Sequence, residues 1–500
     1  MKSWLVVVLS AILITIYIYP SAIRYSKDTL PDNNDTRLIA YIIGQVQDNI
    51  IHHQPLFYGR FFAPEKNTLA YSDLFLTTAI ITLPAQLFTS NPIIIFNLAF
   101  IINSVLTICS AYLLFSYLFK DHWVSAITTL LLILSGFHLH YYPHMQLFSL
   151  WLTCLSIYFF LRFQKDNHPI FLSLFFLVLT AQIGESVFSA YLIFFSAFFL
   201  FITASKKDYK SIVLRSLPFL PFWALLVFPY LQFHFSFPEA SRSIRDAANF
   251  SLGLEQIFTL FNSYTLIIIF ISSFAFVIAR SKATWQSRKN QILPWLYIFV
   301  FSLIMSLGPV VKLLGKTIKI FSLPIPLPYT LFYYLFPGFT GFRTPSRFSN
   351  IILLSMVIII GYSLLPFINK LKIITKIVLT LIIFAFLIFE ADLPLKGYPV
   401  NINMNPVYDQ VKALPQSAII LELPVKLWNM PDHEIESIRS LYSLEHGHRR
   451  FGGFSGFDSN SWADLVQKID ANGLDKENLT KLHALGVTHV INNNQLFPLP

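Results

Sequence analysis

The sequence predicts an all-α membrane protein with about eleven transmembrane helices, a large first extracytoplasmic loop and a small α/β domain at its C-terminal end. Of the 500 residues, 55% are hydrophobic and only 12% are charged, whereas a soluble chain carries about 25% charged residues. The apolar residues are gathered in long runs, and these runs stop after residue 390. A soluble enzyme, a disordered chain and a repeat solenoid are therefore excluded as descriptions of the whole chain.

Each predicted transmembrane helix rests on an apolar run that approaches the roughly 20 residues a bilayer requires. The runs are Trp4–Tyr19, Pro92–Phe119, Val124–Phe137, Leu147–Phe163, Ile170–Gly184, Val187–Ala204, Leu217–Leu231, Leu266–Ala279, Leu293–Val311, Ile351–Pro366 and Ile377–Phe389.

Basic residues orient these runs in the membrane. With a cytoplasmic N-terminus, every even-numbered run leads into a basic loop, as the positive-inside rule requires; the loops contain, among others, Lys120, Arg162, Lys206, Arg280 and Lys370. These loops explain much of the net charge of +10, so no nucleic-acid partner is expected. We expect a multi-pass protein of the cell (plasma) membrane whose C-terminal domain is extracytoplasmic.

Two segments outside the membrane have their own organisation. The transmembrane domain covers 1–390 and includes loop one, 21–91; the tail covers 391–500. Helical spacing over 39–50, with Asn34 or Asp35 as cap, predicts an amphipathic helix at the membrane surface, followed by a second one over 74–88 that is broken at Pro84. In the tail, an α/β alternation is expected from helices over 406–414, 461–469 and 477–485 and strands over 418–424 and 487–491.

Acidic residues in loop one are the first candidates for chemistry. Asp32, Asp35 and Asp73 precede or follow the predicted surface helix. A carboxylate at the membrane surface can act as a general base towards a hydroxyl or bind a divalent metal ion. Asp35 can equally be a helix cap.

A histidine-rich segment, 138–146, is the second candidate. It lies at the outer end of the third run and contains His138, His140, His144 and Gln146. Such histidines can bind a metal ion or contact phosphate, although the spacing without nearby carboxylates is a weak zinc signal. The alternative is an interfacial girdle of histidine and aromatic side chains.

Arginines on the outer side form the third candidate. Arg343 and Arg347 face outward against the positive-inside bias, in the same loop as Lys312, Lys316 and Lys319. The planar arginine side chain suits phosphate, so the pattern indicates an anion site; the alternative is contact with lipid phosphates. Glu185, at the outer end of the fifth run, is either a ligand for a sugar hydroxyl or a hydrated helix end.

The order of these features resembles the large, divergent set of bacterial and archaeal polytopic membrane proteins with a GT-C glycosyltransferase fold, of the RgtA/B/C/D-like or YfhO-like kind. The matching segments are Asp35 with Tyr41, Ala63–Asp73, Pro84, Asn91-Pro92 with Asn97, His144–Leu147 with Trp151, Leu307–Pro309, Leu327–Tyr329, Pro337–Phe348, Leu421–Val425, Gly453–Phe457 and Leu485–Val487.

This resemblance implies an integral-membrane enzyme that transfers a sugar from a polyprenyl-phosphate donor to an acceptor outside the membrane, with inversion. The acceptor is a glycan, a lipid or a protein. Asp35, or Asp32, would be the base. Arg343 and Arg347, with His144, would stabilise the departing lipid phosphate, and Asp73 would hold the acceptor or a divalent metal ion. Gln146 and Glu185 would be further substrate-binding residues. In the family, the two residues after the acidic residue are usually apolar, but here they are Thr36 and Arg37. Because of this difference, Asp32 remains an alternative to Asp35 as the base.

Two other functions remain alternatives at this point. One is a flippase or transporter for a lipid-linked sugar, although inverted repeats and mid-membrane charges, which are typical of transporters, are not evident in the sequence. The other is a non-catalytic protein of envelope assembly. For an enzyme, Asp35, Asp73, His144 and Arg347 should converge on one outer site, because catalytic groups must reach one substrate.

Overall fold

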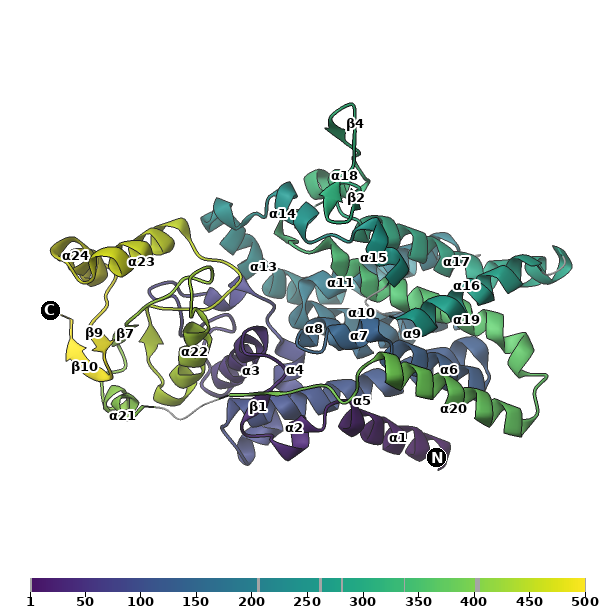
Figure 1. The fold of residues 1–500 in the computed structure, drawn as a ribbon, viewed down its shortest axis with the longest axis horizontal. Helices are drawn as coiled ribbons and strands as arrows, with labels where there is room; N and C mark the ends of the chain where they lie inside the picture. The colour runs from purple at the N-terminus through teal and green to yellow at the C-terminus, as the bar shows by residue number, and fades with distance from the viewer. Residues whose placement is uncertain are drawn as a thin grey trace.

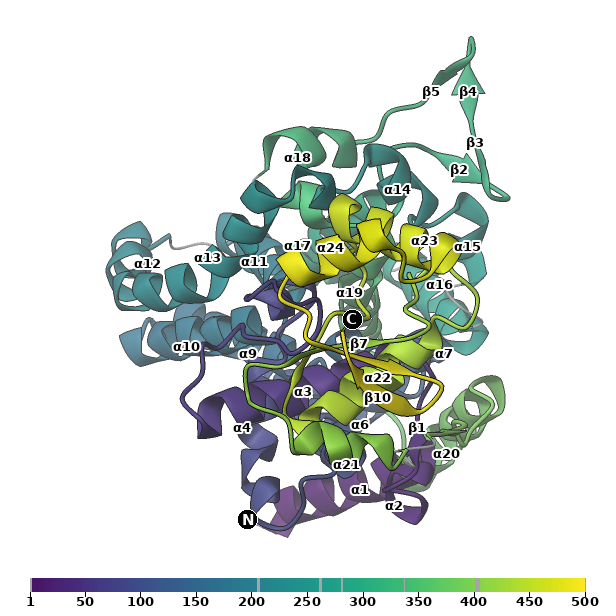
Figure 2. The same ribbon diagram turned by 90° about the vertical axis from the view of Figure 1, so that its left-hand side faces the viewer.

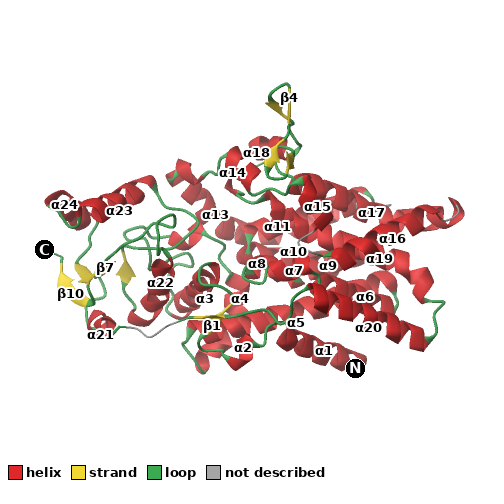
Figure 3. Ribbon diagram, in the orientation of Figure 1, coloured by secondary structure: helices red, strands yellow, loops and turns green. Residues whose placement is uncertain are grey.

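The computed structural model describes residues 2–204, 207–259, 263–279, 282–336, 338–400 and 405–499; Lys206, Arg280 and Pro337, named above, lie outside them. Long helices form a bundle, and the tail lies at one end of it (Figure 1). Short strands occur in the tail, in a projecting arm and in one pair that joins loop one to the start of the tail, whereas the bundle itself is helical (Figure 3).

Every predicted apolar run falls on a helix of this bundle. These helices are α1 (Lys2–Ile18), α5 (Pro92–Phe119), α6 (His122–Ile133), α9 (Trp151–Asp166), α10 (Pro169–Glu185), α11 (Val187–Ile202), α13 (Leu220–Ser236), α16 (Tyr264–Ala279), α17 (Lys282–Ser306), α19 (Ser349–Ile368) and α20 (Ile373–Glu390). Capping residues determine where such a helix begins. At the start of α5, the Asn91 side chain accepts a hydrogen bond from the backbone N–H of Ile93 at 2.8 Å, and Pro92 occupies the first turn.

Within the described residues, six helical stretches are long and apolar enough to cross a membrane: Pro92–Phe119, His122–His140, Met145–Asp166, Tyr209–Ser236, Pro345–Ile368 and Ile373–Glu390. The other apolar helices, α1, α10 and α11 among them, are shorter. The protein is therefore a multi-pass membrane protein, and the number of eleven crossings stays a prediction.

Loop one folds between the bundle and the tail. Its elements are α2 (Ser21–Arg24), β1 (Thr29–Leu30), α3 (Asp35–Ile51), α4 (Leu76–Thr82) and short 3₁₀ turns at Thr68–Tyr71 and Leu83–Leu87. We expected the helix over 39–50 of loop one to lie on the membrane surface. This was wrong, because that helix, α3, is buried along most of its length between α5 and α22 (Glu434–His446) of the tail. Helices α3 and α22 are closest at Gly44, where a β-carbon would lie 2.8 Å from the side chain of Leu444.

The cap of α3 also differs from the prediction. Neither Asn34 nor Asp35 caps the helix through its side chain. Instead, the Asp32 carboxylate accepts hydrogen bonds from the backbone N–H groups of Asn34 at 2.8 Å and Thr36 at 3.0 Å. Asp32 therefore satisfies the free donors at this helix end, and Asp35 is left to face outward.

The tail contains the predicted α/β alternation. A four-stranded sheet has the order β10 (Gln495–Pro498), β9 (His489–Asn492), β7 (Ile419–Glu422), β8 (Arg449–Arg450). Strand β7 is parallel to β8 and β9, and β10 is antiparallel to β9. The helices are α21 (Val407–Lys412), α22, α23 (Asn460–Asn472) and α24 (Lys476–Ala484). The predicted strands and helices correspond to β7, β9, α21, α23 and α24, whereas α22, β8 and β10 were not predicted.

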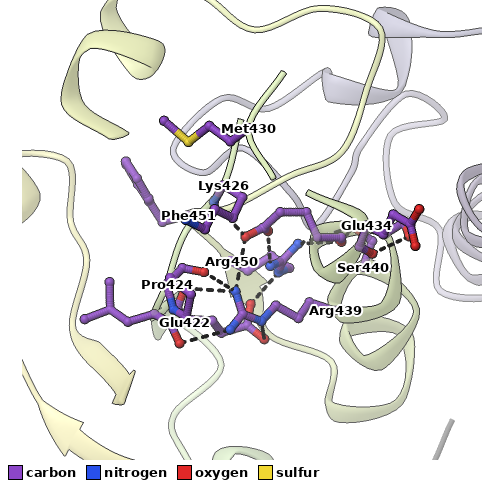
Figure 4. A network of polar contacts seen from close by, with 12 residues as sticks. Glu422, Pro424, Lys426, Met430, Glu434, Arg439, Ser440, Arg450 and Phe451 are labelled. Atoms are coloured by element: carbon purple, nitrogen blue, oxygen red, sulfur yellow. Dashed lines mark hydrogen bonds and ion pairs between the residues drawn. The ribbon is translucent and has the colours of Figure 1, made fainter. Parts of the chain in front are cut away.

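Charged residues, not only apolar ones, fill the centre of the tail (Figure 4). Arg450 is fully buried, and its guanidinium pairs with Glu422 at 2.6 Å and with Glu436 at 2.5 Å. Arg439 pairs with Glu436 at 3.1 Å and donates to the carbonyl oxygen of Pro424 at 2.7 Å. Paired charges of this kind can be buried because their hydrogen bonds replace those to water.

Short elements outside the bundle complete the fold. Helices α7 (Gly136–His140), α8 (Met145–Phe148), α14 (Ile244–Asn249) and α15 (Leu254–Thr259) lie at its tail-facing end, and α12 (Tyr209–Ser216) precedes α13. Strands β2 (Lys312–Leu313), β3 (Lys316–Thr317), β4 (Lys319–Ile320) and β5 (Leu323–Pro324) form an arm that projects sideways (Figure 2), and α18 (Tyr329–Leu335) follows it. Strand β6 (Tyr398–Pro399) pairs with β1 of loop one.

Candidate functional site

Asp35 and His144 meet at the tail-facing end of the bundle. Asp35 is the first residue of α3, and His144 directly precedes α8. The imidazole Nδ1 of His144 lies 3.4 Å from a carboxylate oxygen of Asp35, and both side chains are partly exposed. Burial and the nearby Arg347 cation lower the pKa of His144, despite the opposing charge of Asp35. The lowered pKa favours the neutral imidazole of His144, which lies beside the partly exposed side chain of Asp35.

Arg347 connects this pair to Asp73. The guanidinium of Arg347 interacts electrostatically with both His144 and Asp73. Asp73 is hydrogen-bonded to the side chains of Ser186 and Gln146, and burial raises its pKa in spite of the arginine. Arg347 also lies 5.7 Å from the centre of the Phe188 ring. The structure thus brings Asp35, His144, Gln146, Arg347 and Asp73 into one group, from four separate segments of the chain.

Glu185 has a structural position next to this group. Its two carboxylate oxygens accept hydrogen bonds from the hydroxyl of Thr78 at 2.6 Å and from the backbone N–H of Thr78 at 2.8 Å. The side chain is buried and holds α4 against the end of α10. The burial of Glu185 contradicts the predicted hydrated helix end, whereas its role as a ligand for a sugar hydroxyl stays a prediction. Through Thr78, Glu185 also positions the segment that carries Asp73.

Of the other two histidines in the 138–146 segment, His140 lies close enough to His144 to interact with it electrostatically, whereas His138 packs elsewhere. His138 is buried, with its ring stacked on Phe148 at a centroid distance of 4.5 Å. In the described part of the chain, no three His, Cys, Asp or Glu side chains are grouped so that they could hold a metal ion. The described residues therefore do not provide the ligand set of a metal centre.

Arg343 belongs to a second cluster, nearer the tail. Its guanidinium lies 4.1 Å from the ring centre of Phe250 and 5.6 Å from that of Trp428. Arg242, from the segment after α13, is close to Arg343, and its own guanidinium donates to the backbone of Gly456. The two arginines predicted to act together are thus divided: Arg347 faces Asp73 and His144, whereas Arg343 faces the tail.

Sequence reasoning missed Arg242 and Trp428. Arg343 was noticed because an arginine on the outer side runs against the positive-inside rule. The same signal applies to Arg242, because the predicted topology puts the segment after α13 on the outer side too. Trp428 has no comparable signal, because its place in the tail becomes meaningful only when the fold brings it to Arg343. The lysines Lys312, Lys316 and Lys319 were expected near the anion site but belong to the arm.

A cavity of about 670 Å³ opens between loop one and the tail. Its lining consists of Arg37, Trp428, Asn429, Met430, Pro431, Asp432, His433, Glu434, Ile435 and Ile438. Arg37 stands two positions after Asp35 on α3, and its buried Nε has no hydrogen-bond partner in the protein. Trp428 keeps 49% of its surface exposed. The cavity therefore offers an aromatic face and carboxylates next to the first turn of α3, the helix that begins with Asp35.

Asp458 fixes the backbone of Trp428 and makes the tail sensitive to pH. Burial raises the pKa of Asp458 to about 7, although a hydrogen bond from the Trp428 backbone and the Arg242 cation oppose the shift. The folded protein therefore holds this proton more tightly than the unfolded chain does. Its contribution to stability is complete below about pH 4 and is lost as the pH rises to about 7.

We expect Asp458→Asn to remove this titration. Between about pH 4 and about pH 8, the melting temperature of the variant should fall less than that of the wild type, as measured by scanning fluorimetry of the purified protein. Asp464→Asn, in an exposed ion pair with Lys468, is the control and should leave the pH dependence unchanged. Equal pH dependence in Asp458→Asn and the wild type would contradict the assignment.

The helix bundle, the folded first loop and the tail together define a polytopic membrane protein with a GT-C-like fold, as the resemblance implied. Two solved structures of the arabinofuranosyltransferase AftD from Mycobacteria, one of them a mutant, have this fold. They superpose on 98% of this chain with TM-scores of 0.60 and 0.59 at 11% sequence identity. The matched region is 35% and 36% of those chains, so this chain spans about a third of their length. No protein-family model matches the chain, and no curated protein matches it in sequence.

Proposed function

We propose that this protein is a membrane glycosyltransferase that transfers a sugar from a polyprenyl-phosphate donor to an acceptor hydroxyl on the extracytoplasmic side, with inversion. One observation supports the proposal: Asp35, His144, Arg347 and Asp73 come from distant segments and converge at the tail-facing end of the bundle. The fold shared with a solved arabinofuranosyltransferase supports the same class of reaction.

The donor phosphate fits beside Arg347. This arginine is the cation between Asp73 and His144, and a guanidinium can bind two phosphate oxygens at once. Asp73 and the stacked Phe188 ring hold the side chain in place. As the anomeric bond breaks, negative charge grows on the departing phosphate, and a fixed cation at this point stabilises the transition state. The prenyl chain lies along the apolar helices.

The acceptor approaches from the cavity beneath the tail. Its hydroxyl group reaches Asp35, whose side chain is about half exposed. In a single displacement, Asp35 takes the hydroxyl proton while the acceptor oxygen forms the new bond to the anomeric carbon. The bond between that carbon and the phosphate oxygen breaks at the same time, and polyprenyl phosphate leaves with the electron pair. The neutral imidazole of His144 keeps the Asp35 carboxylate oriented.

The direct test is an assay for transfer. Purified protein in nanodiscs is given radiolabelled polyprenyl-phosphate sugars with an extract of envelope glycans and lipids, and labelled product is separated from donor. Formation of a new glycosidic bond supports the proposal. In parallel, sealed proteoliposomes measure movement of the labelled donor across the bilayer. Translocation without any transfer would favour the flippase alternative and overturn the proposal.

Trp428 tests the acceptor side separately. We expect Trp428→Ala to raise the KM for acceptor about tenfold, because stacking on an aromatic ring contributes about 1–3 kcal/mol to binding of a flat ligand face. The KM for donor should stay within twofold of the wild type. Tyr398→Ala, an exposed aromatic residue outside the cavity, is the control. An equal rise in both KM values would show that the cavity is not an acceptor site.

A further inference from the structure

The projecting arm between α17 and α18 carries two apolar tips. In each hairpin, two residues connect the paired strands: Leu314-Gly315 between β2 and β3, and Phe321-Ser322 between β4 and β5. Leu314 is 76% exposed and Phe321 is 95% exposed. Leu323 and Ile320 beside the second tip are exposed as well. Large hydrophobic side chains held this far into solvent indicate a contact surface.

The backbone at these tips is unfavourable for the residues that occupy it. Leu314, Phe321 and Ser322 have φ values of 48°, 48° and 67°. Turns with positive φ at both central positions favour Asn and Gly, because bulky side chains are strained there. The tail contains the same two-residue turn between β9 and β10, and there Asn493 and Asn494 occupy the positive-φ positions. The arm thus has Leu and Phe where turn chemistry alone favours Asn.

The base of the arm is firmly attached to the protein. Lys312 is buried, and its ammonium group donates to the carbonyl oxygens of Ser251 at 2.7 Å and Asn249 at 3.3 Å. The backbone N–H of Leu314 donates to Glu255 at 2.9 Å. The direction of the arm is therefore set by contacts with the loop that follows α14 and with α15. It is a defined structural element.

The position and charge of the arm indicate what it contacts. It leaves the bundle between the end of α17 and the start of α19, at the tail-facing end, and it points sideways, across the direction of the helices (Figures 1 and 2). Lys316 and Lys319 are exposed directly behind the two tips. Apolar side chains next to lysines are the composition of segments that lie in the membrane interface and attract anionic lipids.

We propose that the arm inserts its two tips into the outer leaflet of the bilayer, where Lys316 and Lys319 contact anionic lipid headgroups. Each tip is a single turn, and the two tips are separate, whereas a stable protein interface buries about 800 Å² on each partner. A lipid surface accepts such small, isolated insertions. The arm then fixes the depth of the outer end of the bundle against the headgroups, independently of the reaction proposed above.

Fluorescence at the second tip tests this proposal. Phe321→Cys is labelled with an environment-sensitive nitrobenzoxadiazole dye in the full-length protein, after Cys109 and Cys154 are changed to Ala. The protein is placed in nanodiscs of phosphatidylcholine with an equal share of phosphatidylglycerol. Asn493→Cys, at the matched turn in the tail, is the control. We expect lipid-borne nitroxide to quench the dye at 321 at least fivefold more than at 493, and aqueous iodide to show the opposite order.

Two outcomes would overturn the proposal. Equal iodide quenching at 321 and 493 would mean that the tip is in water. Protection from iodide without lipid quenching would mean that a protein covers the tip, such as a second copy of this chain. The lysines are tested by Lys316→Ala with Lys319→Ala: the excess lipid quenching in phosphatidylglycerol nanodiscs over pure phosphatidylcholine should disappear, and its persistence would refute the headgroup contact.

Discussion

Asp35→Asn is expected to lower the rate of sugar transfer by about 10²–10⁴-fold, the usual contribution of a general base. The amide cannot take the acceptor proton, but it has the same size as the carboxylate and can still contact His144. The KM for donor should change little, because Arg347 and Asp73 are untouched. Initial rates with saturating donor and acceptor measure the effect, and circular dichroism verifies that the variant is folded.

Two matched variants make this result decisive. Asp28→Asn, at an exposed position of the same loop, should keep wild-type activity. Asp32→Asn alters the cap of α3, which is worth about 1 kcal/mol, so it should lower stability more than turnover. If Asp32→Asn abolishes transfer and Asp35→Asn does not, the base is Asp32 and the assignment to Asp35 is wrong.

Of the variants described above and below, Arg450→Met is expected to lower the free energy of unfolding of the tail the most. The change leaves Glu422 and Glu436 buried without the cation that pairs with both. Removing one partner from a buried ion pair costs about 3–5 kcal/mol, which is a large part of the stability of a domain. We expect the tail to become sensitive to protease at a much lower urea concentration than in the wild type, as measured by pulse proteolysis of the purified protein.

An exposed ion pair provides the comparison for this variant. Lys412→Ala removes the contact of Lys412 with Glu445 at 2.9 Å, where both side chains are partly exposed. Such pairs contribute about 0–1 kcal/mol, so the proteolysis midpoint should barely move. If Arg450→Met behaves like Lys412→Ala, the buried network does not hold the tail together.

The elements that the sequence predicts well are those with a simple hydrophobic pattern. Every long apolar run is a helix, and the short apolar strand at 418–424 is the centre of the tail sheet. Helix α22 was missed because its buried face contains Glu436, Arg439 and Ser440, which read as solvent-exposed. Glu436 and Arg439 pair with each other within the helix, but each also has a charged partner outside it, Arg450 for Glu436 and Glu422 for Arg439. No local pattern reveals these outside partners.

The candidate site was predictable to a similar extent. The predicted topology puts Asp35, His144, Asp73 and Arg347 on the same side of the membrane, and the structure brings the four residues together. The separate place of Arg343 was not predictable, because Arg343 and Arg347 lie one helical turn apart in sequence and their directions depend on Phe250, Trp428 and Phe188. The burial of α3 likewise depends on the tail, which a reading of loop one alone does not include.

The pairing of β1 with β6 has a consequence for biosynthesis. Thr29 and Leu30 pair with Pro399 and Tyr398, and Arg450 exchanges backbone hydrogen bonds with Arg60 and Ala63. Segments that leave the ribosome early therefore receive their partners from segments that leave much later. While residues 391–500 are still missing, loop one has its carboxylates, but the tail residues that line the cavity together with Arg37 are absent. The proposed site is therefore complete only after this tail has been made and has folded onto loop one.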